Sequence, residues 1–300
     1  MLGSCVLTLV SCAADGGETQ PSQNEATTPA PEKKLAYSAN EDNATCTITG
    51  LGECDSSELV IPKEIDGYRV TAIATKAFFN CANLTSITIN DNITNIGENA
   101  FYGCSSLTSI NISSLEAWLN ISFEEYWSNP CYPGGQLYLN GELLTDVTIP
   151  NNITNIGNYA FAGNDHLISV VIPDSVTSIG NNAFVNYKGL TSVTIGDGVT
   201  DMGISVFSGC SSLTDINLPK NLTKIGKSAF SGCAALTSIT IPGKVTEIGG
   251  FAFRGCTSLA NIKFSSTVEK WMQVSRGSNW CTQAPATDVV CTNGTVDTRF

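Results

Sequence analysis

Apolar residues recur along this chain with a period of 23 residues. Successive units begin at Ile153, Val176, Val199, Leu222 and Val245. In residues 176–195 the sequence is Val-Thr-Ser-Ile-Gly-Asn-Asn-Ala-Phe, followed after five residues by Leu-Thr-Ser-Val-Thr-Ile. Three apolar columns run through the units: Ile73, Ile96, Ile156, Ile179, Met202, Ile225 and Ile248; Phe78, Phe101, Phe161, Phe184, Phe207, Phe230 and Phe253; and Leu84, Leu107, Leu167, Leu190, Leu213, Leu236 and Leu259. Repetition at this spacing indicates a stack of similar units.

Each unit contains one clearly predicted strand. Ile239 and Ile241 flank Thr240, and this alternation predicts a short strand that turns both isoleucines inward. Pro242 then ends the strand, because proline cannot donate a backbone hydrogen bond. Residues 225–232 are too few for a full helix, so we expect an extended piece followed by a single helical or 3₁₀ turn.

A period between about 20 and 29 residues, with Leu-x-x-Ile-x-Ile at its centre, is typical of leucine-rich repeats. One unit buries too little apolar surface to offset the conformational entropy of its ordered backbone, whereas stacked units share their faces. We therefore predict a right-handed, curved leucine-rich-repeat solenoid over residues 36–300. It would consist mainly of short parallel β-strands joined by short helical or 3₁₀ turns.

The rhythm is interrupted between residues 113 and 150, and the interruption itself repeats. Four residue pairs are each separated by 153 positions: Trp118 and Trp271, Trp127 and Trp280, Asn140 and Asn293, and Gly141 and Gly294. Residues 265–300 are therefore a second irregular unit. Asn-Gly after an apolar run predicts a β-hairpin in each. The tryptophans either pack as a lid over the core edge, which we favour, or form an aromatic ligand platform.

The N-terminal part divides into three segments. Residues 1–12 are largely apolar and end in Leu-Val-Ser-Cys, which resembles a bacterial lipoprotein signal with lipid attachment at Cys12. The run is short and has no preceding Lys or Arg, so the alternative is a fortuitous apolar start. Residues 13–35 are polar and predict a flexible tether. Residues 43–62 predict an N-terminal cap with strands at 45–48 and 59–61.

The repeat motif resembles that of the BspA-like leucine-rich-repeat family over about residues 43–300. The shared pattern is Val-Thr-x-Ile-Gly-x-x-Ala-Phe-x-Gly-Cys-x-x-Leu-Thr-x-Ile-x-Ile-Pro. Members are typical surface proteins of host-associated anaerobic bacteria and some parasitic protists. The resemblance implies adhesion to host matrix or plasma proteins or to other microbes. Together with the signal-like residues 1–12, it predicts a location at the cell surface or outer membrane, lipid-anchored or secreted.

Charge excludes one class of partner. The chain carries 15 basic and 27 acidic residues, for a net charge of -12. Nucleic acid binding needs clustered Lys and Arg, so no nucleic acid partner is expected. Beyond the N-terminal run no stretch approaches the roughly 20 apolar residues of a membrane span. We therefore expect contact with a membrane only through a lipid at Cys12.

Cysteine is the most conspicuous candidate for chemistry. One repeat position is filled by cysteine in five units: Cys81, Cys104, Cys210, Cys233 and Cys256. Side chains stacked at about 4.8 Å and pointing the same way do not favour bridging, so we interpret them as small buried hydrophobic residues rather than redox or metal groups. Two other pairs are close enough for local disulfides in an oxidising compartment, and otherwise remain reduced: Cys46 with Cys54, and Cys281 with Cys291.

His166 is the one histidine, and it falls in the turn before a predicted strand. A surface role is favoured over that of a base, because no second histidine and no catalytic motif accompany it. No C-x-x-C pair is present to suggest a metal site. We therefore predict no catalytic residue, no cofactor and no metal.

The outward strand positions form the candidate binding site. They are Thr88, Asn111, Thr148, Val171, Thr194, Asn217, Thr240 and Lys263. At about 4.8 Å per strand this row would give a mostly uncharged surface about 35 Å long. The structural alternative is that threonine simply suits exposed strand positions.

The first functional hypothesis is that this row binds a protein ligand, such as a host matrix or plasma protein. The second is that the same face binds carbohydrate or an envelope polymer. A polysaccharide-lyase type of enzyme is disfavoured, because Asp146, Asp215 and Lys263 are too scattered to form a catalytic cluster.

Overall fold

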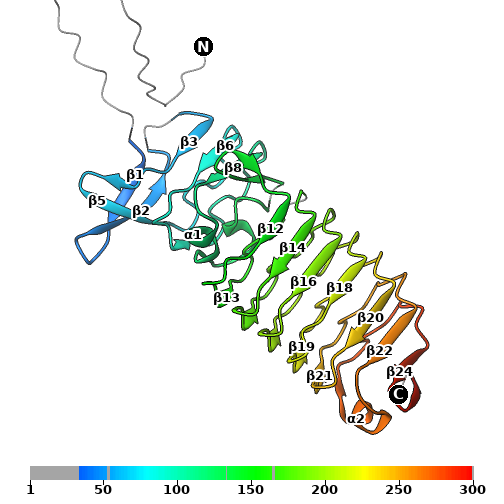
Figure 1. Ribbon diagram of the computed structural model, residues 1–300. Coiled ribbons are helices and arrows are strands. Elements are labelled where there is room, and N and C mark those ends of the chain that lie inside the picture. Colours follow the sequence, from blue (N-terminus) through cyan, green and yellow to red (C-terminus); the bar gives the residue numbers. More distant parts are fainter. Residues whose placement is uncertain (1–33, 53–54, 133, 164–165, 299–300) are drawn as a thin grey trace, which may run out of the picture.

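The computed structural model describes residues 34–52, 55–132, 134–163 and 166–298. It confirms the predicted solenoid, an elongated stack of coils with few helices (Figure 1). Cys12 and Cys54 lie outside the described residues. Most coils add one strand to each of two lines of parallel strands, which run along different sides of the stack.

The first line, the strand face, contains the predicted strands. It is divided into three sheets. The first holds β3 (Glu58–Val60), β6 (Ser86–Thr88), β8 (Ser109–Ile112), β10 (Gln136–Leu139) and β11 (Glu142–Leu143). The second holds β12 (Asp146–Thr148), β14 (Ser169–Ile172), β16 (Ser192–Ile195) and β18 (Asp215–Asn217). The third holds β20 (Ser238–Ile241), β22 (Asn261–Phe264), β24 (Asp288–Cys291) and β25 (Gly294–Asp297).

The second line consists mostly of two-residue strands. One sheet contains β1 (Ala36–Ala39), β2 (Thr45–Gly50), β4 (Glu64–Ile65), β5 (Tyr68–Ile73), β7 (Asn95–Ile96) and β9 (Ser122–Phe123). The other contains β13 (Asn155–Ile156), β15 (Ser178–Ile179), β17 (Asp201–Met202), β19 (Lys224–Ile225), β21 (Glu247–Ile248) and β23 (Ser275–Arg276). These strands keep the apolar column in register, as in the pairing of Ile156 with Ile179.

The core lies between the two lines and follows the apolar columns. The column phenylalanines are buried, and successive rings stack from Phe161 to Phe253 at centroid distances of 5.2 to 5.7 Å. Ile239 and Ile241 point inward, as predicted from the alternation around Thr240. Continuous stacking of identical side chains explains why no coil needs its own complete core.

The helical turn predicted in each unit is replaced by consecutive tight turns. In residues 225–233 the N–H of Ser231 donates to Ser228, while the N–H of Phe230 donates to Ala252 in the next coil. Local and inter-coil hydrogen bonds alternate along this segment, and Ser228 adopts a positive φ of 55°. A helix would direct all its N–H groups within the coil, so the inter-coil bonds favour this conformation.

Polar side chains add hydrogen bonds between coils. The thiols of Cys104, Cys210, Cys233 and Cys256 each donate to the carbonyl of the column phenylalanine in the preceding coil, over 3.0 to 3.2 Å. Threonine hydroxyls do the same beside the strands, as where Thr223 donates to the Thr200 carbonyl over 3.0 Å. Four of the five repeat cysteines are thus buried as predicted, whereas Cys81 is half-buried. Each of the four thiols adds a link between its coil and the preceding one.

Helices are confined to the two irregular units in the described part of the chain. They are α1 (Leu115–Leu119), the 3₁₀ helix η1 (Tyr126–Ser128) and α2 (Val268–Gln273). The predicted Asn-Gly hairpin joins β10 to β11, with Asn140 and Gly141 both at positive φ. In the terminal unit β24 and β25 form the hairpin, and its two-residue loop is Thr292–Asn293.

The internal irregular unit interrupts the stack. The strand β9 ends one sheet and β13 begins the next, and no described backbone–backbone hydrogen bond joins residues 115–139 to residues 153–163. Side chains make the connection instead. The indole N–H of Trp118 donates to the Ala160 carbonyl over 2.9 Å, and the Asn129 amide donates to the Tyr159 carbonyl over 2.8 Å. We call this boundary the junction.

Candidate functional site

The predicted binding row lies on the strand face, with every member at an outward position. Thr148, Val171, Thr194, Asn217, Thr240 and Lys263 are exposed, whereas Thr88 and Asn111 are half-buried. The residues on either side along each strand point into the core, as Val193 and Ile195 do around Thr194. Because the strands pair in register, Val171, Thr194 and Asn217 are direct neighbours across three strands.

The row is not continuous, although the sequence predicts a single row. Asn111 pairs with Tyr138 of β10, and β10 then pairs with β11, which runs antiparallel. Thr148 begins a separate sheet beside Val171. The β10–β11 hairpin therefore separates Thr88 and Asn111 from the longer run that begins at Thr148.

Three residues extend the row beyond the positions predicted for it. Val60 pairs with Thr88, Tyr138 pairs with Asn111, and Val290 pairs with Lys263. Val60 and Val290 are each 49% exposed, so both ends of the strand face present apolar side chains. Leu137-Tyr138-Leu139 carries the inward–outward–inward alternation that could have identified Tyr138, but it follows Ile110 by 27 residues instead of 23.

Hydrogen bonds organise polar groups near the hairpin. The Ser169 hydroxyl donates to the Asp146 carboxylate, which also accepts from the Thr145 hydroxyl over 3.0 Å. His166 is exposed in its turn, as predicted, and contacts the side-chain amide of Gln136. These contacts hold the side chains in place.

Aromatic side chains form a second exposed feature, the aromatic strip, on the turns. Its members in spatial order are Phe79, Tyr102, Trp127, Tyr132, Tyr126 and Tyr159, with successive ring centroids 4.7 to 5.2 Å apart. Phe79 is 40% exposed and Tyr102 is 41% exposed. The other three tryptophans are buried, so the packing interpretation is confirmed for them, while half-buried Trp127 belongs to this strip.

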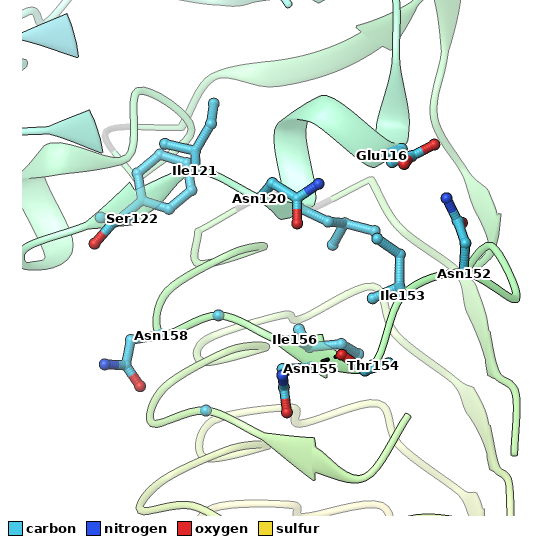
Figure 2. A pocket seen from close by; sticks show the side chains of 14 residues that line it. Glu116, Asn120, Ile121, Ser122, Asn152, Ile153, Thr154, Asn155, Ile156 and Asn158 are labelled. Atoms are coloured by element: carbon cyan, nitrogen blue, oxygen red, sulfur yellow. Dashed lines mark hydrogen bonds between the residues drawn. The ribbon is translucent and has the colours of Figure 1, made fainter. Parts of the chain in front are cut away.

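A cleft of about 470 Å³ opens at the junction between α1, β9 and β13 (Figure 2). We call it the junction cleft. Its rim carries Glu116, Asn120, Ser122 and Asn152, while buried residues such as Ile153 lie beneath. Sequence reasoning missed this cleft, because the motif around Ile156-Gly157 is the same as in the closely stacked coils.

The repeat itself decides the family. The sequence matches the family described as "BspA type Leucine rich repeat region" in six copies, over residues 52–129, 135–260 and 223–274. These ranges cover more than half of the chain. The chain belongs to the BspA-type leucine-rich-repeat family.

Solved structures of similar fold come from bacteria. A leucine-rich-repeat protein from Bacteroides ovatus is 24% identical to this chain, with a TM-score of 0.52. The match covers 86% of this chain and 70% of the Bacteroides ovatus chain. A leucine-rich cell surface protein from Faecalibacterium prausnitzii is 24% identical over 80% of this chain and 95% of its own, with a TM-score of 0.45. No curated protein matches the chain.

The BspA-type cysteines are protected thiols. Burial raises the pKa of Cys104 and of Cys210 to about 12, so neither forms a reactive thiolate near neutral pH. Cys281 and Cys291 are both unbridged, which leaves the local disulfide between them unformed.

Within the described ranges no group of three or more His, Cys, Asp or Glu side chains is arranged to hold a metal ion. No helix in those ranges is long and apolar enough to cross a membrane.

Proposed function

We propose that the strand face of this BspA-type protein binds a protein ligand, and that the chain serves as an interaction or adhesion module at the cell surface. The observation that carries the proposal is the exposed, in-register row from Thr148 to Asn217, held by parallel pairing. Such a row is rigid before binding, so little conformational entropy is lost when a ligand docks.

The composition of the face supports a protein ligand. Hydroxyl and amide groups make up most of the face, with apolar Val171 within the row and Val60 and Val290 at its ends. Lys263 is the one charged residue in the row. Protein interfaces combine such apolar contacts with neutral hydrogen-bonding groups and have few charges at their centre.

The N-terminal segment supplies the proposed attachment. Lipid at Cys12 would anchor the chain, and the polar residues after it would hold the solenoid away from the membrane. Mass spectrometry of the native N-terminus tests this part. A diacylglycerol adduct on Cys12 is expected, whereas an unmodified Met1 would contradict it.

Binding is tested with two substitutions on the strand face. The full chain is used to capture partners from host matrix and plasma, and Thr148→Arg and Thr194→Arg are then compared with it. Each large cation on the row should weaken partner binding by at least about tenfold, because it introduces an unpaired charge at the interface. Thermal stability should be unchanged, since both side chains are exposed.

Ser211→Arg is the matched control, because Ser211 is also exposed but lies in a turn away from the strands. It should bind partners as the parent chain does. Equal binding by the parent chain and both threonine variants would show that the strand face is not the interface.

A further inference from the structure

The junction cleft differs from the other spaces along the stack in its backbone. In regular coils the N–H of the glycine after the second strand donates to the preceding coil, as from Gly180 to Ile156 over 2.8 Å and from Gly203 to Ile179 over 2.9 Å. The Thr177 N–H likewise donates to the Thr154 carbonyl over 2.8 Å. Among the described residues no backbone carbonyl accepts from the N–H of Gly157 or Thr154, which are the equivalents of Gly180 and Thr177 beside the cleft. Donors on this wall are therefore available to a ligand.

The spacing at this wall is also wider than elsewhere. A Cβ built on Gly157 would lie 3.6 Å from the Ile121 carbonyl oxygen, an ordinary contact. The same atom on Gly180 would lie 2.7 Å from the backbone nitrogen of Asn158, too close for any real side chain. The coil after the internal unit thus stands apart from α1 and β9 where the other coils close together.

The rim of the cleft carries polar side chains that have no partner within the described protein. Glu116, Asn120, Ser122 and Asn152 make no side-chain hydrogen bond there, although all four line the same space. Figure 2 shows the Asn120 amide projecting into the opening from the end of α1, with Asn155 and Thr154 on the opposite wall. Amides offer both donors and acceptors, a hydroxyl offers both, and a carboxylate accepts.

The aromatic strip begins where the cleft ends. Tyr159 directly follows Asn158 of the cleft wall, and its ring lies 4.9 Å from that of Tyr126 between centroids. From there the strip continues through Tyr132 to half-buried Trp127. A ligand long enough to leave the cleft at this end would pass onto aromatic side chains.

We propose that the junction cleft and the adjoining aromatic strip form a binding site for a neutral oligosaccharide. Sugar hydroxyls both donate and accept hydrogen bonds, and so match the unpartnered amides, the serine hydroxyl and the open N–H groups. The C–H faces of sugar rings pack against aromatic side chains. The cleft volume of about 470 Å³ lies within the roughly 300–1,000 Å³ typical of small-ligand sites.

Charge and polarity exclude the competing ligand classes. Glu116 is the one charged residue that lines the cleft, and the chain carries a net charge of -12, so an anionic glycan would be repelled. A protein partner would need apolar anchor pockets. The apolar residues of the cleft, such as Ile121, Ile153 and Ile156, are at most 3% exposed and are already used in the core.

The experiment is a titration of the full chain with three neutral hexasaccharides, followed by tryptophan fluorescence. The probes are β-1,4-linked glucose, β-1,4-linked N-acetylglucosamine and α-1,4-linked glucose, with a heparin hexasaccharide as the anionic comparison. Trp127 is the half-buried tryptophan, so a sugar on the strip should change its emission, and at least one neutral probe should give a saturable change. Trp127→Phe should abolish most of that change.

A double variant assigns the binding to the cleft. Asn120→Ala with Asn152→Ala should weaken binding of the neutral probe by about tenfold or more, since each lost hydrogen bond accounts for roughly fivefold. Neither side chain contacts another described residue through a hydrogen bond, so the melting temperature should be retained. The single variant Asn152→Ala should show a smaller loss in the same direction. Thr194→Arg on the strand face is the control and should leave sugar affinity unchanged.

Four results would overturn the proposal: no saturable response to any neutral probe, heparin binding at least as tight as that of the neutral probes, unchanged sugar affinity in the double variant, or loss of protein-partner capture in that variant. The last would place the cleft in the protein interface. This site is independent of the strand-face proposal, because Thr148→Arg and Thr194→Arg test that face without altering the cleft.

Discussion

The internal and terminal irregular units share tryptophans and an Asn-Gly pair at equal spacing, yet these residues have different environments. In the internal unit Trp118 donates to Ala160 of the following coil. Its counterpart Trp271 is completely buried, and its indole nitrogen has no hydrogen-bond partner among the described residues. The side chain is placed by the unit itself, whereas its polar contact depends on whether another coil follows.

The second tryptophan pair shows the same dependence on neighbours. The backbone carbonyls of Trp127 and Trp280 make equivalent hydrogen bonds, since they accept from the N–H of Phe101 and of Phe253 respectively. Trp280 packs edge-on against Phe253 and Trp271 and is 7% exposed. Trp127 instead joins the aromatic strip. The comparison teaches that a repeated motif fixes backbone pairing, while the surrounding coils decide which rings reach the surface.

The largest expected effect concerns the coil that follows the internal unit. Gly180→Ala should destabilise the chain by about 2 to 3 kcal/mol, because its Cβ overlaps the Asn158 backbone in the adjacent coil. Gly157→Ala should change stability by no more than about 1 kcal/mol, since its Cβ meets only ordinary contacts. Urea unfolding of both variants measures the difference. Equal losses would show that the internal unit contacts the next coil as tightly as regular coils contact one another.

The tryptophan pair gives the next largest difference. Trp118→Phe and Trp271→Phe remove similar buried area, but only the first removes a hydrogen bond. Trp118→Phe should therefore be more destabilising by about 1 kcal/mol, by thermal or urea unfolding. A larger loss at Trp271 would indicate that its N–H has a partner in solution.

The asparagines of the two hairpins should respond differently to substitution by glycine. Asn140 has a φ of 52° in its loop, so Asn140→Ala should cost about 1 kcal/mol while Asn140→Gly should be nearly neutral. Asn293 instead accepts from the Val268 N–H over 2.8 Å at the start of α2. Asn293→Ala and Asn293→Gly should therefore both cost about 1 kcal/mol. Asn293→Asp should not restore the stability, because its carboxylate would lie beside that of Glu269, to which the Asn293 amide donates over 3.1 Å. Rescue by glycine at both positions would remove the distinction.

The smallest expected difference between the two irregular units is in the labelling rate of their cysteines, which involves no change in the stability of the chain. Burial raises the pKa of both Cys131 and Cys281, but Cys131 is 1% exposed whereas Cys281 is half-buried. Iodoacetamide at pH 8 should label Cys281 well before Cys131, and labelling of Cys281 should accelerate as the pH rises toward its pKa. Peptide mass spectrometry measures the order, with the guanidinium-unfolded chain as the control in which both react. Faster reaction at Cys131 would show that the internal unit opens readily.

The regular part of the fold could be predicted from sequence because each position recurs. The columns of Ile179 and Phe184 identify the inward faces, and their spacing gives the register. The turns were harder, since Ser228 and its equivalents bond to the next coil and a single unit contains no signal of that partner. The outward row was placed correctly on its strands, but its continuity was wrong. Tyr138 of β10 lies next to Asn111 where Thr148 was expected, and no strand pairing joins Asn217 to Thr240 among the described residues.

The junction cleft could not be predicted for a related reason. Ile156-Gly157 has the same sequence as Ile179-Gly180, and only the course of the preceding coil distinguishes them. Helix α1 displaces that coil, and no repeat position records the displacement. The unpartnered Asn120 lies in the irregular unit. Asn152 occupies a repeat position that varies between units, with Ser175, Gly198, Asn221 and Lys244 in the others, so neither residue has a special signature.

The absence of backbone hydrogen bonds across the described junction also bears on how the molecule carries load. A cell-surface module that holds a ligand is pulled between its attachment and that ligand. Regular coils distribute such tension over many backbone hydrogen bonds, whereas at the junction it falls on a few side-chain contacts, including those of Trp118, Tyr126 and Asn129. We expect the molecule to yield first at this point, extending as two segments in succession while the Phe161–Phe253 ladder keeps its shape.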